Sequence, residues 1–275
     1  MVITTKRCKV GICEWVLPFR GPEAIFYAAK LGFDGIQIEE RGGFSAGYPL
    51  LQKELQQQYT ETASHCGIRL QTLHLWSLCR EAGMIHPLDS PAGKAALQSL
   101  QAGVDTCAAM GIEKLMVTSG FLCQIKSRQD FDRFASMLKA ACRMGEEKGV
   151  TIVFESVLTS SELHEMIHIV GKSLKICYDI FNPIRFSTGD PLTEIKELGL
   201  PAIDHFHLKD GPENLIGCVP LGEGAGRFDR VAQMIRALGY TGWLVSENYY
   251  WDPPMKQPPT ALVERDLSTI KRFFD

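Results

Sequence analysis

Four residues of metal-binding type each lie near the end of a short apolar run in the second half of the sequence. They are Glu155, Asp179, His207 and Glu247. Three carboxylates and one imidazole suit a borderline-hard divalent ion such as Mn²⁺, Mg²⁺ or Co²⁺, and Zn²⁺ also accepts these ligands. A single carboxylate in such a place is more often a helix cap or a surface ion pair, but four on successive runs indicate a shared site. We therefore predict that the four converge on one divalent metal ion, with Mn²⁺ preferred.

The four apolar runs have the length of β-strands, and strand-like and helix-like segments alternate along the whole chain. The expected strands are Lys9–Trp15, Gly35–Glu39, Ile68–Leu75, Glu113–Thr118, Thr151–Glu155, Lys175–Asp179, Ile203–Leu208 and Trp243–Glu247. The expected helices are Pro22–Leu31, Pro49–Cys66, a long helix with Ser90 as its N-cap and Gly111 at its end, Arg128–Lys148, Ser160–Val170, Pro191–Leu198, Phe228–Leu238 and Ala261–Phe273. Strict alternation implies parallel strands joined by crossover helices.

Eight strand–helix units in 275 residues predict the α/β class and, within it, a single (β/α)8 TIM barrel. No GxGxxG motif follows the first strand, which argues against an open dinucleotide-binding sheet. We see no linker, so residues 1–275 are expected to form one domain. Function in such a barrel lies at the carboxyl ends of the strands. Because side chains alternate along a strand, His207 shares its inward face with His205 and Lys209.

The overall composition narrows the choice of partner and compartment. The chain is 45% hydrophobic and 22% charged, with a net charge of −3. No basic block stands out, which argues against a nucleic-acid partner. The nine cysteines form no CxxC pair, and no run approaches the roughly 18 apolar residues of a membrane span. We expect a cytoplasmic protein with reduced thiols and no membrane partner.

Several motifs, taken in order, resemble those of a known superfamily. They are Phe154-Glu155, Tyr178-Asp179, His205-Phe-His207-Leu-Lys-Asp210, Pro220-Leu-Gly-Glu-Gly224 and Gly239-Tyr-Thr-Gly242 ahead of Glu247. Over nearly its whole length the sequence resembles the xylose isomerase-like TIM-barrel superfamily, in particular its sugar phosphate isomerase/epimerase members. The resemblance implies one divalent metal on the four residues named above. It also implies action on a small ketose, a polyol-derived ketone or a sugar phosphate, in a protein that forms a homodimer or homotetramer.

The resemblance also implies a mechanism. Removing a proton from a carbon next to a carbonyl creates an enediolate, and a chelating metal stabilises that anion by several kcal/mol. In superfamily members that are epimerases, two glutamates lie on opposite faces of the substrate. We expect Glu155 and Glu247 to have these catalytic roles, one removing the proton and the other returning it. His207 is taken as the metal ligand rather than His205 because it precedes Leu-Lys-Asp.

Six further residues are expected to bind the substrate. They are Glu14, His74, Trp76, Asn182, His205 and Lys209. Asn182 stands where many relatives carry His and would hydrogen-bond a substrate hydroxyl. His205 is either a partner of the metal ligand or a buried, hydrogen-bonded core residue. Lys209 either binds a substrate oxygen or forms an ion pair with Asp210 or Glu247.

Two other activities fit the same scaffold. A metal-dependent dehydratase of an inosose or a dehydroshikimate-like acid would use the same enediolate chemistry to expel a hydroxyl group, and its product would be lighter by one water. An apurinic endonuclease would use three zinc ions and more histidines than the seven of this chain. The acidic net charge further disfavours the endonuclease.

Overall fold

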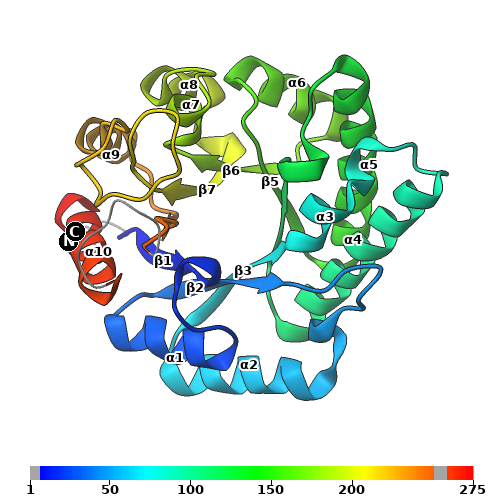
Figure 1. The fold of residues 1–275 in the computed structure, drawn as a ribbon, viewed down its shortest axis with the longest axis horizontal. Coiled ribbons are helices and arrows are strands. Elements are labelled where there is room, and N and C mark those ends of the chain that lie inside the picture. The colour runs from blue at the N-terminus through cyan, green and yellow to red at the C-terminus, as the bar shows by residue number, and fades with distance from the viewer. Residues whose placement is uncertain (1–6, 251–258, 275) are drawn as a thin grey trace, which may run out of the picture.

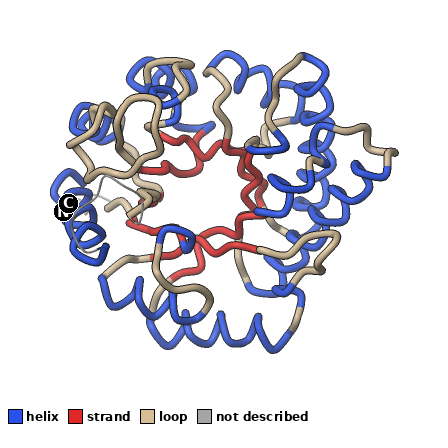
Figure 2. The backbone as a smooth tube through the Cα atoms, viewed as in Figure 1, coloured by secondary structure: helices blue, strands red, loops and turns tan. Residues whose placement is uncertain are grey.

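Eight parallel strands close into a barrel in which each strand pairs with the next and β8 pairs with β1. The computed structural model describes residues 7–250 and 259–274. Seen down the barrel, the strands form an inner ring and the helices an outer one (Figures 1 and 2). The predicted (β/α)8 barrel is confirmed.

The strand boundaries agree closely with the predicted ones. The strands are β1 (Lys9–Cys13), β2 (Gly35–Glu40), β3 (Arg69–Leu75), β4 (Lys114–Thr118), β5 (Thr151–Glu155), β6 (Lys175–Asp179), β7 (Ile203–Leu208) and β8 (Trp243–Ser246). The first strand is shorter than predicted because Glu14–Val16 turns into a 3₁₀ helix, η1. Glu247 lies one residue beyond β8.

The helices follow the expected order, with short additions. They are α1 (Pro22–Leu31), α2 (Lys53–Cys66), α3 (Trp76–Glu81), α4 (Pro91–Met110), α5 (Arg128–Lys148), α6 (Ser160–Val170), α7 (Asn182–Arg185), α8 (Pro191–Leu198), α9 (Phe228–Ala237) and α10 (Pro259–Phe274). The hydroxyl oxygen of Ser90 accepts a hydrogen bond from Gly93 N at 3.0 Å, as a helix N-cap does. No described helix combines the length and the apolar character needed to span a membrane.

The predictions missed α3 and α7 and joined η2 (Pro49–Leu51) to α2. Extended backbone at Gln52 separates η2 from α2. The short helices α3 and α7 have six and four residues, too few to show a helical periodicity of apolar residues.

The apolar residues form two separate cores. The larger lies between the strands and the helices and contains Phe154 and Phe206. A small cluster of Met116, Val153 and Cys177 fills part of the barrel interior. Side chains thus alternate along β5, with Phe154 in the outer core and Val153 inside, and the place of Phe206 in the outer core agrees with the inward face predicted for His205 and His207.

Two bulges interrupt the ladder and bring polar side chains inward. Between β2 and β3, Ile36 pairs with Leu70 but Gln37 pairs with Thr72, so Gln71 is an extra residue. Between β6 and β7, the pairing skips Asp204 in the same way. A bulge redirects the side chain that it leaves unpaired, and both extra residues contact interior polar groups.

Candidate active site

The four predicted ligands meet at the carboxyl end of the barrel. One donor atom from each of Glu155, Asp179, His207 and Glu247 lies within 4.8 Å of the others. All four residues are buried, and none is more than 6% exposed. They come from the ends of β5 and β6, from β7, and from the residue after β8. The structure therefore brings together the whole predicted set.

His207 turns its two ring nitrogens to different surroundings. Nδ1 lies 3.3 Å from Glu155 Oε1 and 3.1 Å from Glu247 Oε2. Nε2 lies 2.9 Å from Gln37 Oε1, away from the carboxylates. Nδ1 is thus the nitrogen that faces the cluster.

Asp179 divides its two oxygens between the backbone and the cluster. Oδ1 accepts hydrogen bonds from the backbone N–H groups of Phe181 and Asn182, at 2.7 and 2.9 Å. Oδ2 is buried, and the Lys209 Nζ cation lies 2.5 Å from it. The fold therefore fixes this carboxylate and leaves one oxygen to be satisfied by positive charge.

Lys209 is an ion-pair partner in the cluster. Its Nζ lies 2.5 Å from Asp179 Oδ2 and 2.9 Å from Glu247 Oε2, and the side chain is only 5% exposed. Of the two ion pairs that we considered, the one with Glu247 is present. Asp210 instead accepts backbone hydrogen bonds from Gly211 and from three glycines of the following loop.

The charges of the cluster perturb one another strongly. Burial is the largest influence on Glu247 and opposes ionisation, but Lys209 and His207 outweigh it and hold the pKa of Glu247 well below its usual value. Burial raises the pKa of Asp179 to about 6 despite the nearby Lys209 cation. For His207, burial favours the neutral ring, but nearby acidic groups, among them Glu247 and then Glu155, raise its pKa well above the usual value.

The donor set fits a divalent cation. Three carboxylates and one ring nitrogen converge, and the Lys209 ammonium lies 2.5 Å from the Asp179 oxygen that faces the cluster. Burying three carboxylates close together costs free energy unless nearby positive charge offsets their repulsion and lost hydration. Oxygen-rich sets with one imidazole suit Mn²⁺, Mg²⁺, Co²⁺ or Zn²⁺.

Each glutamate of the cluster is also held by a neutral donor. The Thr118 hydroxyl donates to Glu155 Oε2 at 3.1 Å, and the Trp15 indole donates to Glu247 Oε1 at 2.9 Å. Sequence reasoning missed both donors. Thr118 ends β4 and pairs in register with Glu155, so an alignment of strand ends was the signal that could have found it.

His74 and Trp76 lie beside this part of the site. The Nε2 atom of His74 is 3.2 Å from the Thr118 hydroxyl, and its ring centroid is 5.0 Å from that of Trp15. The Trp76 ring packs edge-on against Phe121 at 4.7 Å. The rings of Trp15, His74 and Trp76 thus form an aromatic wall, and the Trp15 indole of that wall contacts Glu247.

The other expected substrate-binding residues have different surroundings. Both carboxylate oxygens of Glu14 accept backbone N–H groups, from Gly21 at 2.5 Å and Glu39 at 3.0 Å. A substrate contact would have to displace these bonds. Asn182 is buried at the start of α7, and its backbone N–H donates a hydrogen bond to Asp179 Oδ1. His205 is fully buried below His207, its ring between Asp204 and Gln37.

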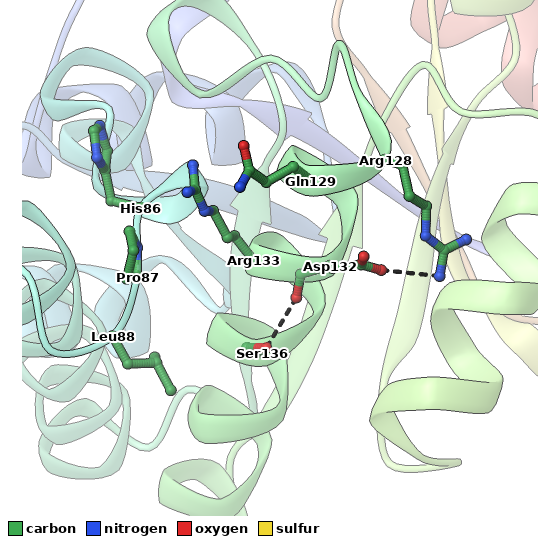
Figure 3. Close-up of a pocket in the computed structure, with 8 residues that line it drawn as sticks. All are labelled: His86, Pro87, Leu88, Arg128, Gln129, Asp132, Arg133 and Ser136. Atoms are coloured by element: carbon green, nitrogen blue, oxygen red, sulfur yellow. Dashed lines mark hydrogen bonds and ion pairs between the residues drawn. The ribbon is translucent and has the colours of Figure 1, made fainter.

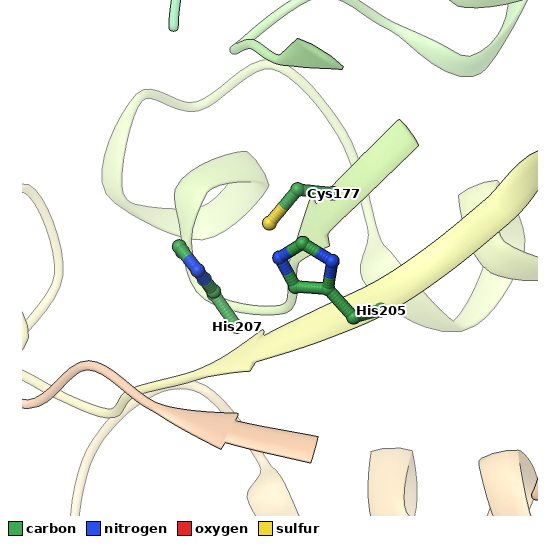
Figure 4. A group of neighbouring side chains, drawn as sticks. All are labelled: Cys177, His205 and His207. Atoms are coloured by element: carbon green, nitrogen blue, oxygen red, sulfur yellow. The ribbon is translucent and has the colours of Figure 1, made fainter. Parts of the chain in front are cut away.

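A second group of metal-binding side chains lies deeper in the barrel. Cys177, His205 and His207 approach one another there (Figure 4). Burial raises the pKa of the Cys177 thiol far above its usual value, which opposes the thiolate that a metal requires. Both ring nitrogens of His205 already have hydrogen-bond partners. This group is therefore better explained as hydrogen-bonded core.

A surface pocket of about 690 Å³ lies apart from these residues. It is formed by the segment from His86 to Leu88 and the first turns of α5 (Figure 3). Its Arg128 is paired with Asp132 and Glu165. None of the four clustered residues lines it, so it adds no group to the metal-type site.

Comparison with known proteins finds a matching family and a relative that covers most of the chain. The family model of the xylose isomerase-like TIM barrel matches residues 25–273. The 2-epi-5-epi-valiolone 7-phosphate 2-epimerase of Actinoplanes sp. is 30% identical over 248 residues, which cover 89% of this chain and 88% of that protein. An inosose dehydratase of Bacillus thuringiensis is 26% identical over 155 residues, or 48% of this chain and 51% of the relative.

Solved structures show the same fold at low sequence identity. The D-psicose 3-epimerase of Clostridium cellulolyticum H10 superposes with a TM-score of 0.77 at 16% identity, covering 97% of this chain and 99% of that one. The 3-keto-D-glucoside 4-epimerase of E. coli gives a TM-score of 0.76 at 16% identity, covering 97% and 100%.

Proposed function

The chain belongs to the xylose isomerase-like TIM-barrel family and is an enzyme of the isomerase class, and we propose that it epimerises a small α-hydroxy ketone. The observation that carries this proposal is the buried convergence of three carboxylates and one imidazole. The epimerase that is 30% identical over most of both chains supports the same reaction type.

Glu155, Asp179, His207 and Glu247 are the residues that would hold a divalent metal, with Mn²⁺ preferred. When bound, such an ion supplies positive charge that stabilises the enediolate formed next to a carbonyl. The protein's own part is to hold the ligands in place. Backbone N–H groups fix Asp179, and Gln37 fixes the ring of His207.

Glu155 and Glu247 are the proposed proton carriers. They come from β5 and from the end of β8, which are not neighbours in the barrel, so they approach a bound substrate from different directions. Each has one oxygen held by a neutral donor, Thr118 or Trp15. One glutamate removes the proton from the carbon beside the carbonyl, and the other returns a proton to the opposite face.

The substrate is expected to be a ketose or a polyol-derived ketone, with or without a phosphate group. The name of the Actinoplanes epimerase includes a 7-phosphate, which makes phosphorylated cyclitol ketones a natural part of a substrate screen. Lys209, which pairs with Asp179 and Glu247, and Asn182, whose backbone N–H donates to Asp179, are the proposed contacts for substrate oxygens. His74 and Trp76 are the proposed contacts for a carbon face of the ring.

The direct test is proton exchange in D₂O with the Mn²⁺-loaded protein. Candidate ketones, each with and without phosphate, are incubated and followed by NMR. We expect deuterium at the carbon next to the carbonyl together with the epimer of the substrate. The proposal is contradicted if the wild-type protein holds no metal after reconstitution. It is also contradicted if the metal-loaded protein exchanges a proton of none of the ketones.

A dehydratase is the second candidate, because inosose dehydratases match about half of the chain. The same screen separates the two activities by mass. An epimerised product keeps the mass of its substrate, apart from exchanged deuterium, whereas a dehydrated product is lighter by one water.

A further inference from the structure

A chain of hydrogen bonds crosses the barrel interior beneath His207. Asp204 Oδ2 lies 2.7 Å from His205 Nδ1, and His205 Nε2 lies 2.7 Å from the amide nitrogen of Gln37. The amide oxygen of Gln37 lies 2.9 Å from His207 Nε2. His205, Gln37 and His207 are each 0% exposed, so water does not compete for these bonds.

The direction of the hydrogen bonds is set from the Asp204 end. A carboxylate only accepts, so the Nδ1–H of His205 donates to Asp204. The amide nitrogen of Gln37 only donates, so Nε2 of His205 accepts. The same amide nitrogen lies 2.9 Å from Gln71 Oε1, a second acceptor. The Gln37 amide therefore turns its oxygen toward His207.

The far end of the chain is anchored where the barrel strands begin. Lys114, the first residue of β4, lies 3.0 Å from Asp204 Oδ2. The β6–β7 bulge places Asp204, and the β2–β3 bulge places Gln71. Bulges of this kind are frequent at barrel rims and next to active sites, where they redirect a side chain.

We propose that Gln37 and His205 are positioning residues, which in the metal-bound protein keep the proton of His207 on Nε2 and leave Nδ1 as the nitrogen available to a divalent cation. The inference rests on the proposed function, because it assumes that the cluster of four ligands binds metal. Nδ1 already faces Glu155 and Glu247. A proton on Nδ1 instead would put an N–H where the ion must bind.

The substitution Gln37→Met tests the chain, because it keeps the length of the side chain and removes both polar atoms. Loss of a group that orients a metal ligand commonly weakens metal binding about 10–100-fold. Gln101→Met is the matched control, because the Gln101 side chain hydrogen-bonds Asp105 on α4, in the outer ring of helices. Calorimetric titration of the metal-stripped proteins with Mn²⁺ gives the Kd of each, and thermal unfolding shows whether each variant is folded.

We expect Gln37→Met to raise the Kd for Mn²⁺ about 10–100-fold and Gln101→Met to change it less than about 3-fold. A Gln37→Met protein that binds Mn²⁺ as tightly as wild type would overturn the inference and leave the proposed function standing. A wild-type protein that binds no Mn²⁺ would overturn the proposed function itself, and the inference with it.

A measurement on the wild-type protein does not depend on how the variants fold. Long-range ¹H–¹⁵N NMR correlations on the Zn²⁺-loaded, ¹⁵N-histidine-labelled protein identify the ring nitrogen that carries a proton. We expect that nitrogen to be Nε2 in His207 and Nδ1 in His205. A proton on Nδ1 of His207 would refute the proposed direction of the hydrogen bonds.

Discussion

Lys209 offers a sharp test of the electrostatics of the cluster. Its ammonium group lies 2.5 Å from Asp179 Oδ2 and 2.9 Å from Glu247 Oε2, at 5% side-chain exposure. The substitution Lys209→Met keeps most of the apolar stem and removes only the charge. In metal-free protein it leaves the carboxylates without their closest cation.

The expected cost follows from that burial. Removing one partner of a buried ion pair typically destabilises a protein by about 3–5 kcal/mol, because the other charge stays uncompensated. In a domain of this size each kcal/mol lowers the unfolding midpoint by about 2–4 °C. Lys209→Met should therefore lower the midpoint of the EDTA-treated protein by about 6–20 °C.

Added Mn²⁺ should reverse part of this loss. A ligand at 100 times its Kd stabilises the folded state by about 2.7 kcal/mol. Because the ammonium and the metal compete for the same carboxylate oxygens, we expect Mn²⁺ to raise the midpoint of Lys209→Met by more than it raises that of wild type.

Thermal unfolding in EDTA and in excess Mn²⁺ measures both effects. Lys148→Met is the control, because Lys148 forms an exposed ion pair with Asp105 at 3.7 Å and such pairs contribute about 1 kcal/mol or less. The reasoning is refuted if Lys209→Met in EDTA unfolds at the temperature of the control, or if Mn²⁺ stabilises Lys209→Met less than wild type.

Three further predictions concern the glutamates, their support and pH. Glu155→Gln and Glu247→Gln should each lower turnover about 10²–10⁴-fold with an unchanged circular dichroism spectrum; a near-normal rate would exclude that residue as a proton carrier. Thr118→Val removes a hydrogen bond to a charged group and should lower kcat/KM about 10–100-fold, whereas Thr118→Ser keeps the hydroxyl and should retain most activity; equal losses in both would point to packing instead. Burial raises the pKa of Asp266 from 3.8 to about 6. A carboxyl group with a raised folded pKa stabilises the fold below its unfolded pKa, and that contribution is lost as pH rises through the folded pKa. The unfolding free energy of wild type relative to Asp266→Asn should therefore fall by up to about 3 kcal/mol between pH 4 and 7, and parallel pH profiles would contradict this.

The sequence by itself determined the barrel and its four central residues. Strand and helix segments alternate, and the spacing of apolar residues along the sequence changes from one kind of segment to the other. Four helices end at a glycine with positive φ, namely Gly32, Gly67, Gly111 and Gly149. Because strands of a closed parallel barrel point their carboxyl ends to one side, residues that end successive strands must approach one another. Proximity of Glu155, Asp179 and His207 therefore followed from topology alone.

Only the tertiary structure decided which atoms meet. Trp15, in η1, donates to Glu247 across 232 residues of sequence, and no local pattern marks that contact. The bulges at Gln71 and Asp204 shift the register by one residue, a change that strict alternation along a strand does not anticipate. They allow Asp204 to reach His205, and through Gln37 they decide which nitrogen of His207 faces the carboxylates. Such contacts depend on where side chains lie across the barrel to within an ångström. Closure of the whole sheet sets these positions, and no single segment of the sequence encodes them.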